Sequence, residues 1–263
     1  MSDSASSSPQ QDDHAGDRSH GTESLLAGPA CAGRLERFDW ATMGSALDGE
    51  GCAVLPSLLN VEDCERFAAS YDAAGQFRSR VVMARHGFGR GEYQYFAYPL
   101  PDPLTVLRTD LYRRLVPVAN RWNERLGVGS TFPPEHADFL QRCHDAGQSR
   151  PTPLLLRYGP GDYNCLHQDL YGEHVFPLQV AVLLSRPDDD FSGGEFVLTE
   201  QRPRMQSRAE VVPLRHGDAV VFAVNSRPHR GTKGDYRVTM RHGVSRVRSG
   251  RRHTLGIIFH DAA

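Results

Sequence analysis

The chain changes character at residues 154–169, which read LLLRYGPGDYNCLHQD: a short apolar run, a turn of glycine, proline and aspartate, and a His-x-Asp motif. Apolar runs of this length that are bounded by turn residues are typical of strands. Their spacing towards the C-terminus favours a sandwich or double-sheet barrel over a parallel α/β fold. The predicted strands lie around Leu154–Leu156, Leu178–Leu184, Phe196–Leu198, Val211–Val212, Ala219–Val224, Val238–Met240 and Leu255–Phe259.

The first half of the chain has a helical pattern instead. A short helix is predicted from Phe38 to Leu47 with Asp39 as its N-cap, and another begins at Asn60, whose side chain can cap it. Residues 103–126 carry apolar side chains every three or four positions, which predicts a longer helix. We therefore expect a mainly β protein with flanking helices, an α+β fold.

The composition of the N-terminal segment predicts the domain organisation. Residues 1–33 are expected to form a disordered tail, because they are rich in Ser, Asp, Gln and Gly and nearly lack large apolar side chains. Residues 34–263 are expected to form one domain, with a helical part (34–150) and a β core (151–263). No apolar run follows a basic N-terminus or approaches a membrane-spanning length, so we expect a cytoplasmic protein with no membrane partner.

His167 and Asp169 indicate metal chemistry. They lie two residues apart, so on an extended strand both side chains point to the same face. Two imidazoles and one carboxylate are the ligands of a non-haem Fe(II) centre that keeps three coordination positions open for reactants. The second imidazole must come from elsewhere in the chain, and both His229 and His242 follow the predicted strand 219–224.

The order of motifs around these residues resembles that of the 2-oxoglutarate- and Fe(II)-dependent dioxygenases. The pattern of that family is His-x-Asp, a distal His, and an Arg about ten residues after it, and Arg252 lies ten residues after His242. The closing run, 255–262, is also similar to a bacterial subfamily classed as nucleic-acid-damage oxygenases. Elements that resemble the family in the same order over roughly residues 150–262 are Arg157–Tyr163, Ser192–Phe196, Gly217–Phe222, His242–Val244 and Ser249–Leu255.

The resemblance implies a fold and a metal centre. The fold is a double-stranded β-helix, or jelly-roll, with the N-terminal helices packed on one sheet. The metal ligands are His167, Asp169 and His242, and the cofactors are Fe(II) and the cosubstrate 2-oxoglutarate. His242 is preferred over His229 because of its spacing to Arg252 and the Gly-Val that follows it. His229 is then expected in a loop near the mouth of the site.

Three residues are expected at the cosubstrate: Arg252, Thr254 and Tyr158. A guanidinium matches a carboxylate with two parallel hydrogen bonds. Thr254 shares the strand face of Arg252, whereas the adjacent Arg251 points to the other face. Tyr158 is similar in position to a family tyrosine that contacts the cosubstrate, and an aromatic core residue is an equal alternative.

Cysteine and charge patterns add two expectations. Five cysteines without a Cys-x-x-Cys pair favour reduced thiols. Cys165, two residues before His167, is expected to be a small buried hydrophobe and not a ligand. Residues 202–252 hold thirteen Arg or Lys against three Asp or Glu, which favours an anionic partner. A solvated outer face of strands is the alternative.

The segment 77–96 mixes arginines, glycines and aromatic residues, and it has two interpretations. It is either a substrate lid, with arginines on phosphates and aromatic rings stacked on an unpaired base, or a loop followed by an ordinary strand. The residues that would form the lid are Arg78, Arg80, Arg85, Arg90, Tyr93, Tyr95 and Phe96.

The leading functional hypothesis is therefore a dioxygenase, an oxidoreductase that couples oxidative decarboxylation of 2-oxoglutarate by dioxygen to hydroxylation of a substrate C–H bond. Oxidative demethylation of damaged nucleic acid is the first substrate hypothesis. The alternatives are a hydroxylase of a small metabolite or protein side chain, and a non-catalytic metal-binding jelly-roll sensor.

Overall fold

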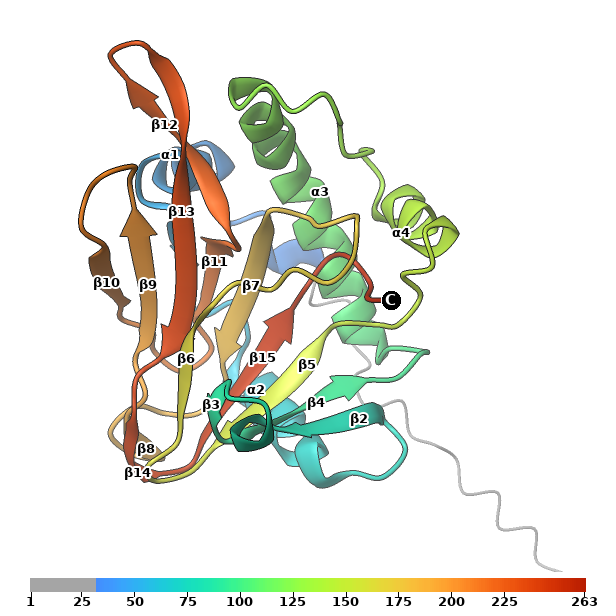
Figure 1. Cartoon of the computed structure of the whole chain (residues 1–263). Helices are drawn as coiled ribbons and strands as arrows, with labels where there is room; N and C mark the ends of the chain where they lie inside the picture. The colour runs from blue at the N-terminus through green and yellow to red at the C-terminus, as the bar shows by residue number, and fades with distance from the viewer. Residues whose placement is uncertain (1–31) are drawn as a thin grey trace, which may run out of the picture.

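The computed structural model describes residues 32–263, in which two antiparallel sheets face each other and helices cover the outer side of one of them (Figure 1). The larger sheet has the order β1 (Cys52–Leu55), β11 (Ala219–Ala223), β7 (Leu178–Leu183), β15 (Arg252–Ile257), β5 (Leu154–Tyr158), β4 (Glu92–Phe96) and β2 (Phe77–Val82). The smaller sheet has the order β10 (Arg208–Val212), β9 (Phe196–Gln201), β13 (Gly234–Val244), β6 (Tyr163–His167) and β3 (Gly89–Arg90), and β12 (Ser226–Gly231) pairs with β13. At one end β8 (Phe191–Gly193) pairs with β14 (Val247–Gly250). The predicted mainly β, double-sheet fold with helices packed on one sheet is confirmed.

The helices are α1 (Trp40–Glu50), α2 (Val61–Ala69), α3 (Asp102–Arg125) and α4 (His136–Asp145), with 3-10 turns at Ala32–Arg34, Ser70–Asp72 and Met83–Arg85. The two predicted N-caps are present. The Asp39 carboxylate accepts hydrogen bonds from the backbone of Ala41 and Thr42, and Asn60 caps α2 through the backbone N–H of Asp63. Helix α3 continues through Pro117, and α4 was not predicted.

The alternation of side chains along β7 separates the core from the space between the sheets. Leu178, Val180 and Val182 belong to the same buried apolar cluster as the inner side of α3, which covers that face of the larger sheet. The alternate residues Gln179 and Ala181 line a cavity between the two sheets. A strand of period two thus presents one face to the helices and the other to the cavity.

The segment 77–96 forms β2 and β4 of the larger sheet, β3 of the smaller sheet and the 3-10 turn at Met83–Arg85, so the region predicted as helical also supplies part of the β core. Phe96 is fully buried in the main apolar cluster. Arg78 donates a hydrogen bond to the Pro151 carbonyl, and Arg80 pairs with Glu92. The interpretation as ordinary strands therefore holds for β2 and β4, and a lid that places Phe96 on the substrate is wrong.

One expectation falls outside the described residues, and another is tested only within them. Residues 1–31 of the predicted tail, with Cys31, lie outside the described residues. Within residues 32–263, no helix combines the length and the apolar character that crossing a membrane requires.

Candidate metal and cosubstrate site

A cavity of about 220 Å³ lies between the two sheets. All six residues that the sequence analysis placed at the site line it: His167, Asp169, His242, Arg252, Thr254 and Tyr158. They come from β5, β6 and the loop after it, β13 and β15. Residues that are distant in sequence thus meet in one cavity.

Strand pairing brings the three candidate metal ligands together. His242 on β13 lies directly opposite His167 at the end of β6, and their ring centroids are 4.2 Å apart. The Nε2 atoms of His167 and His242 lie 3.4 and 3.3 Å from the two carboxylate oxygens of Asp169. One ligand atom from each residue falls within 4.8 Å of the others, which is close enough for a single ion to contact all three.

A bulge in β6 determines which side chains enter the cavity. Val244 pairs with Asn164 and His242 pairs with His167. The four residues 164–167 of β6 therefore lie opposite the three residues 242–244 of β13, so β6 contains one extra residue. Asn164 and His167 both line the cavity as a result, whereas Cys165 is exposed. The prediction of a buried Cys165 is wrong, because the bulge leaves its side chain outside the cavity on an exposed part of β6. Gly243 permits the close approach, since a Cβ there would lie 2.7 Å from the Asn164 carbonyl oxygen.

The three candidate ligands influence one another's protonation in the cavity. The Nδ1–H of His167 donates to the Cys165 carbonyl at 2.8 Å, so its Nε2 faces the site. Burial lowers the pKa of His167, but the hydrogen bond and the charge of Asp169 outweigh burial and raise that pKa. Burial lowers the pKa of His242 in spite of the Asp169 carboxylate, so its imidazole is neutral. Burial raises the pKa of Asp169, but the bonds from both imidazoles outweigh it and keep that pKa well below its ordinary value.

Residues that the sequence analysis did not single out hold the ligand loop. The side-chain amide of Gln168 donates to the carbonyls of Asn225 and Met240, at 2.9 and 2.8 Å, and so ties the loop to β13 just before His242. The Tyr171 hydroxyl donates to Asp169 Oδ1 at 2.7 Å. A motif of the form His-x-Asp carries no sequence signal for either contact.

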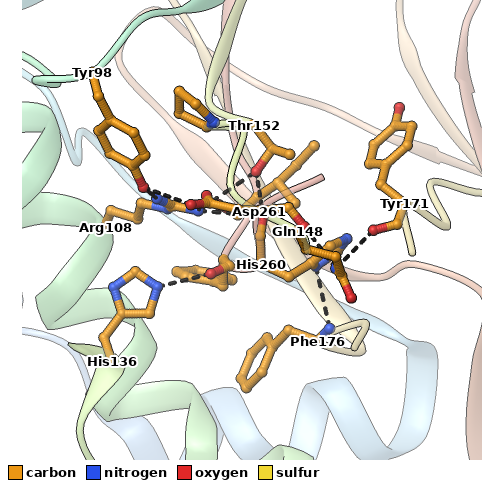
Figure 2. A network of polar contacts seen from close by, with 12 residues as sticks. Tyr98, Arg108, His136, Gln148, Thr152, Tyr171, Phe176, His260 and Asp261 are labelled. Atoms are coloured by element: carbon orange, nitrogen blue, oxygen red, sulfur yellow. Dashed lines mark hydrogen bonds and ion pairs between the residues drawn. The ribbon is translucent and has the colours of Figure 1, made fainter. Parts of the chain in front are cut away.

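The loop that carries Tyr171 is held in turn by Gln148, which lies in the network shown in Figure 2. The Gln148 Nε2 donates to the carbonyls of Tyr171, His174 and Asp261, and its Oε1 accepts from the His174 backbone. Gly172 has φ +103°, and a Cβ there would overlap Gln148. The amide of Gln148 is therefore fully used in fixing this loop.

Behind Gln148, a buried ion pair joins α3 to the end of the chain (Figure 2). Arg108 Nη2 lies 2.9 Å from Asp261 Oδ1, and both side chains are almost wholly buried. Tyr98 and His144 contact the other oxygen of Asp261. The pair is thus enclosed by hydrogen bonds, which lets a buried charge pair persist.

Arg252 is a buried cation without a carboxylate partner. Its side chain is 2% exposed, and no Asp or Glu oxygen of the described residues lies within 4 Å of it. One guanidinium nitrogen donates to the Thr254 hydroxyl, and Tyr158 and Phe191 lie beneath the group at 5.6 and 5.9 Å. Burial lowers the pKa of Arg252 to about 10, so it stays charged at neutral pH. Such a charge needs an anion.

Space for Arg252 depends on a glycine, and its neighbour takes the opposite face. Gly194 has φ +66°, and a Cβ there would lie 2.9 Å from Arg252 Cδ. Arg251 is exposed, as its alternation with Arg252 predicts. Any side chain at 194 would therefore push the guanidinium out of position.

His229 lies elsewhere. It sits in β12, opposite Tyr236 of β13, and does not line the cavity. The expected loop near the mouth is therefore wrong, because residues 226–239 form a hairpin in which β12 pairs with the first half of β13.

The basic stretch 202–252 contains basic residues that pair with carboxylates and others that are exposed without a carboxylate nearby. Arg227 is buried against Glu200, and Arg202 pairs with the same carboxylate. The exposed basic residues of this stretch that have no carboxylate within 4 Å, among the residues described, are Arg204, Arg215, Lys233, Arg237, Arg241, Arg246, Arg248 and Arg251.

Comparisons with known proteins agree with this geometry. Residues 91–262 match the model of the family Oxygenase-NA, described as "Oxygenase, catalysing oxidative methylation of damaged DNA". Two uncharacterized proteins of Mycobacterium tuberculosis, from different strains, are 49% identical to the chain over 168 residues, which is 64% of this chain and 72% of each relative.

Solved structures share the fold at low sequence identity. A prolyl-4-hydroxylase of Pseudomonas putida aligns with a TM-score of 0.51 at 14% identity, over 83% of this chain and 96% of that one. An oxidoreductase of the 2OG-Fe(II) oxygenase family from Burkholderia pseudomallei gives 0.51 at 17%, over 86% and 94%. A prolyl hydroxylase of Trichoplax adhaerens gives 0.52 at 15%, over 89% and 94%. At these identities the likeness establishes the fold.

Proposed function

The chain belongs to the Oxygenase-NA family of oxygenases, and we propose that it is an Fe(II)- and 2-oxoglutarate-dependent dioxygenase that removes methyl groups from damaged nucleic acid. One observation carries the proposal. Ligand atoms of His167, Asp169 and His242 lie within 4.8 Å of one another in the cavity that also contains the buried Arg252, which has no carboxylate partner among residues 32–263.

The donor set fits Fe(II). Two imidazoles and one carboxylate on one side of a cavity leave the opposite side for reactants. His167 presents Nε2 because its Nδ1–H is bonded to the Cys165 carbonyl, and Tyr171 orients the Asp169 carboxylate. Such outer contacts fix ligand orientation and raise metal affinity.

The remaining groups fit a dicarboxylate. Arg252 supplies a planar fork for the distal carboxylate of 2-oxoglutarate, and Thr254 adds a hydroxyl beside it. Tyr158 is fully buried next to Arg252, and its hydroxyl has no partner among the described residues. These three residues would orient the cosubstrate with its keto acid end towards the triad.

When bound, the iron and the cosubstrate supply the oxidising chemistry, in which 2-oxoglutarate, dioxygen and a C–H bond become succinate, carbon dioxide and a hydroxylated carbon. On a methyl group attached to nitrogen, the hydroxymethyl product releases formaldehyde and restores the N–H. The protein binds and orients both substrates, and the apolar walls exclude water.

Nucleic acid is favoured as the substrate by the family description and by charge near the cavity. Phe88 lines the cavity and is 48% exposed. Arg85 and Arg90 flank it in sequence, and both are exposed without a carboxylate within 4 Å in the described part of the chain. Cations beside an exposed aromatic ring suit a phosphate backbone and an unstacked base.

Turnover with defined oligonucleotides tests the proposal. Single-stranded DNA with a methylated base is expected to raise succinate formation above the level without substrate and to release an equal amount of formaldehyde. Unmethylated DNA of the same sequence should do neither. If no methylated strand binds or raises turnover, the nucleic-acid substrate is wrong.

The salt dependence of binding tests the basic residues. Replacing both Arg85 and Arg90 with Gln should reduce the slope of log affinity against log salt by roughly 1.4, because each lost phosphate contact on a single strand contributes about 0.7. Arg113→Gln is the control, since Arg113 lies on α3 on the other side of the larger sheet. Equal slopes for all three proteins would exclude Arg85 and Arg90 from binding.

A further inference from the structure

One wall of the cavity contains a buried amide without a partner. Gln179 on β7 is 3% exposed and lines the cavity. Its Nε2 has no hydrogen-bond partner within residues 32–263. Buried polar groups are almost always paired, because an unpaired one destabilises the fold. The unpaired amide therefore lowers the stability of the ligand-free protein, and a ligand that bonds to it would remove this penalty.

Gln148 offers an internal comparison. It is 1% exposed, and its amide makes four hydrogen bonds to backbone groups, as Figure 2 shows in part. Both the Nε2 and the Oε1 of this buried glutamine thus have hydrogen-bond partners. Gln179, which faces the cavity, is left with its donor free.

The pairing of β7 places Gln179 at the depth of the metal triad. Gln179 lies opposite Phe222 of β11, and the Phe222 ring centroid is 4.6 Å from that of His242. Thr254, beside Arg252, pairs instead with Leu183, four residues further along β7. At about 3.3 Å per residue this is roughly 13 Å away. The amide therefore lies at the reaction end of the cavity and away from the end that holds Arg252.

Apolar and aromatic side chains lie near this end of the cavity. Ile258 and Tyr171 line the cavity. Ile258 follows Ile257, which pairs with Val180 next to Gln179, and the Tyr171 hydroxyl is already bonded to Asp169. A flat aromatic ring with polar atoms on one edge fits such a chamber, because its faces contact rings and its edge can reach the amide.

We propose that Gln179 is a specificity-determining residue whose amide hydrogen-bonds the edge of an adenine base in the cavity; this rests on the proposed nucleic-acid function. A glutamine amide offers a donor beside an acceptor. It matches the N7 acceptor and N6 amino donor of adenine, whereas guanine presents two acceptors, O6 and N7, on the same edge. A methyl group at N1 leaves this adenine edge free and weakens base pairing, which eases extrusion of the base.

Thermal unfolding of the metal-free protein gives a readout that does not depend on activity. Gln179→Met keeps the size of the side chain and removes the unpaired amide, so its Tm should equal or exceed that of the wild type, with a rise on the order of 2–4 °C. Gln148→Met is the matched control, and its Tm should fall because four backbone groups lose their partner. A lower Tm for Gln179→Met would mean that Gln179 is structural and would overturn the proposal.

Lesion preference tests the assigned ligand. The probes are two single-stranded oligonucleotides of the same sequence that carry N1-methyladenine or O6-methylguanine at one position. The wild type should favour the adenine lesion in formaldehyde release, measured as kcat/KM, and Gln179→Met should reduce that preference at least about tenfold, because the paired contact to N7 and N6 is lost.

The outcomes separate the inference from the function on which it rests. If both proteins act on methylated DNA with the same preference, the role of Gln179 is wrong and the proposed function stands. A rise in the KM for 2-oxoglutarate in Gln179→Met, with lesion preference unchanged, would assign the amide to the cosubstrate and overturn the inference. If the wild type responds to no methylated oligonucleotide, the proposed function and the adenine ligand fail together.

Discussion

The sharpest prediction from the cosubstrate end of the cavity concerns Arg252→Lys. The substitution keeps the positive charge but replaces a planar fork with a single ammonium group, in a site that is 2% exposed. One charge-assisted hydrogen bond to the distal carboxylate is lost, and Thr254 loses its donor. A loss of about 1.5–3 kcal/mol corresponds to a roughly ten- to hundredfold rise in the KM for 2-oxoglutarate.

The assay is succinate formation at saturating Fe(II) over a range of 2-oxoglutarate concentrations. Arg251→Lys is the matched control, because the neighbouring side chain is exposed on the opposite face of β15. Its KM should equal that of the wild type. If the two substitutions change the KM equally, or if neither changes it, Arg252 does not bind the cosubstrate.

Three further predictions concern the supports of the site and of the fold. Tyr171→Phe removes the hydroxyl that orients Asp169, so Fe(II) affinity measured by anaerobic titration should fall about 10- to 100-fold; an unchanged affinity would exclude the contact from metal binding. Gly194→Ala places a Cβ 2.9 Å from Arg252 Cδ at positive φ and should raise the KM for 2-oxoglutarate, and a normal KM would show that the guanidinium can move aside without loss. Burial lowers the pKa of His136 to about 3 and that of His260 to about 4. As the pH falls below about 6.5, these histidines are therefore protonated in the unfolded chain before they are protonated in the folded protein. The free energy of unfolding, measured by urea titration, should fall between pH 6.5 and 4 by up to about 1.4 kcal/mol per pH unit for each histidine. His136→Gln should make that fall less steep, and an equal slope would mean that His136 is protonated in the fold.

Local sequence signals predicted much of the fold. The N-caps Asp39 and Asn60 and the apolar runs of the later strands act through neighbouring residues, so they could be read directly from the chain. Segment 77–96 could not be assigned in the same way. The strand β4 exists because it pairs with β5, more than fifty residues away, where Gln94 lies opposite Leu155.

The same difference between local sequence signals and long-range packing applies to the candidate site. Two-residue alternation predicted that Arg252 and Thr254 share a face, and their side chains are bonded to each other. The exposure of Cys165 could not be predicted, because it follows from the bulge in β6, which shifts the alternation by one residue. Gln179 could not be recognised at all, since its lack of a partner is a property of three-dimensional packing and a glutamine in a strand has no special sequence context.

The central claim is that His167, Asp169 and His242 bind one catalytic Fe(II), and metal stoichiometry tests it most directly. Anaerobic Fe(II) titration in the presence of 2-oxoglutarate should give one ion per chain for the wild type and for His229→Ala. Tight binding should be lost in His242→Ala, because His242 lies opposite His167 in the cavity and His229 lies outside it. Full binding by His242→Ala, together with loss in His229→Ala, would contradict the account.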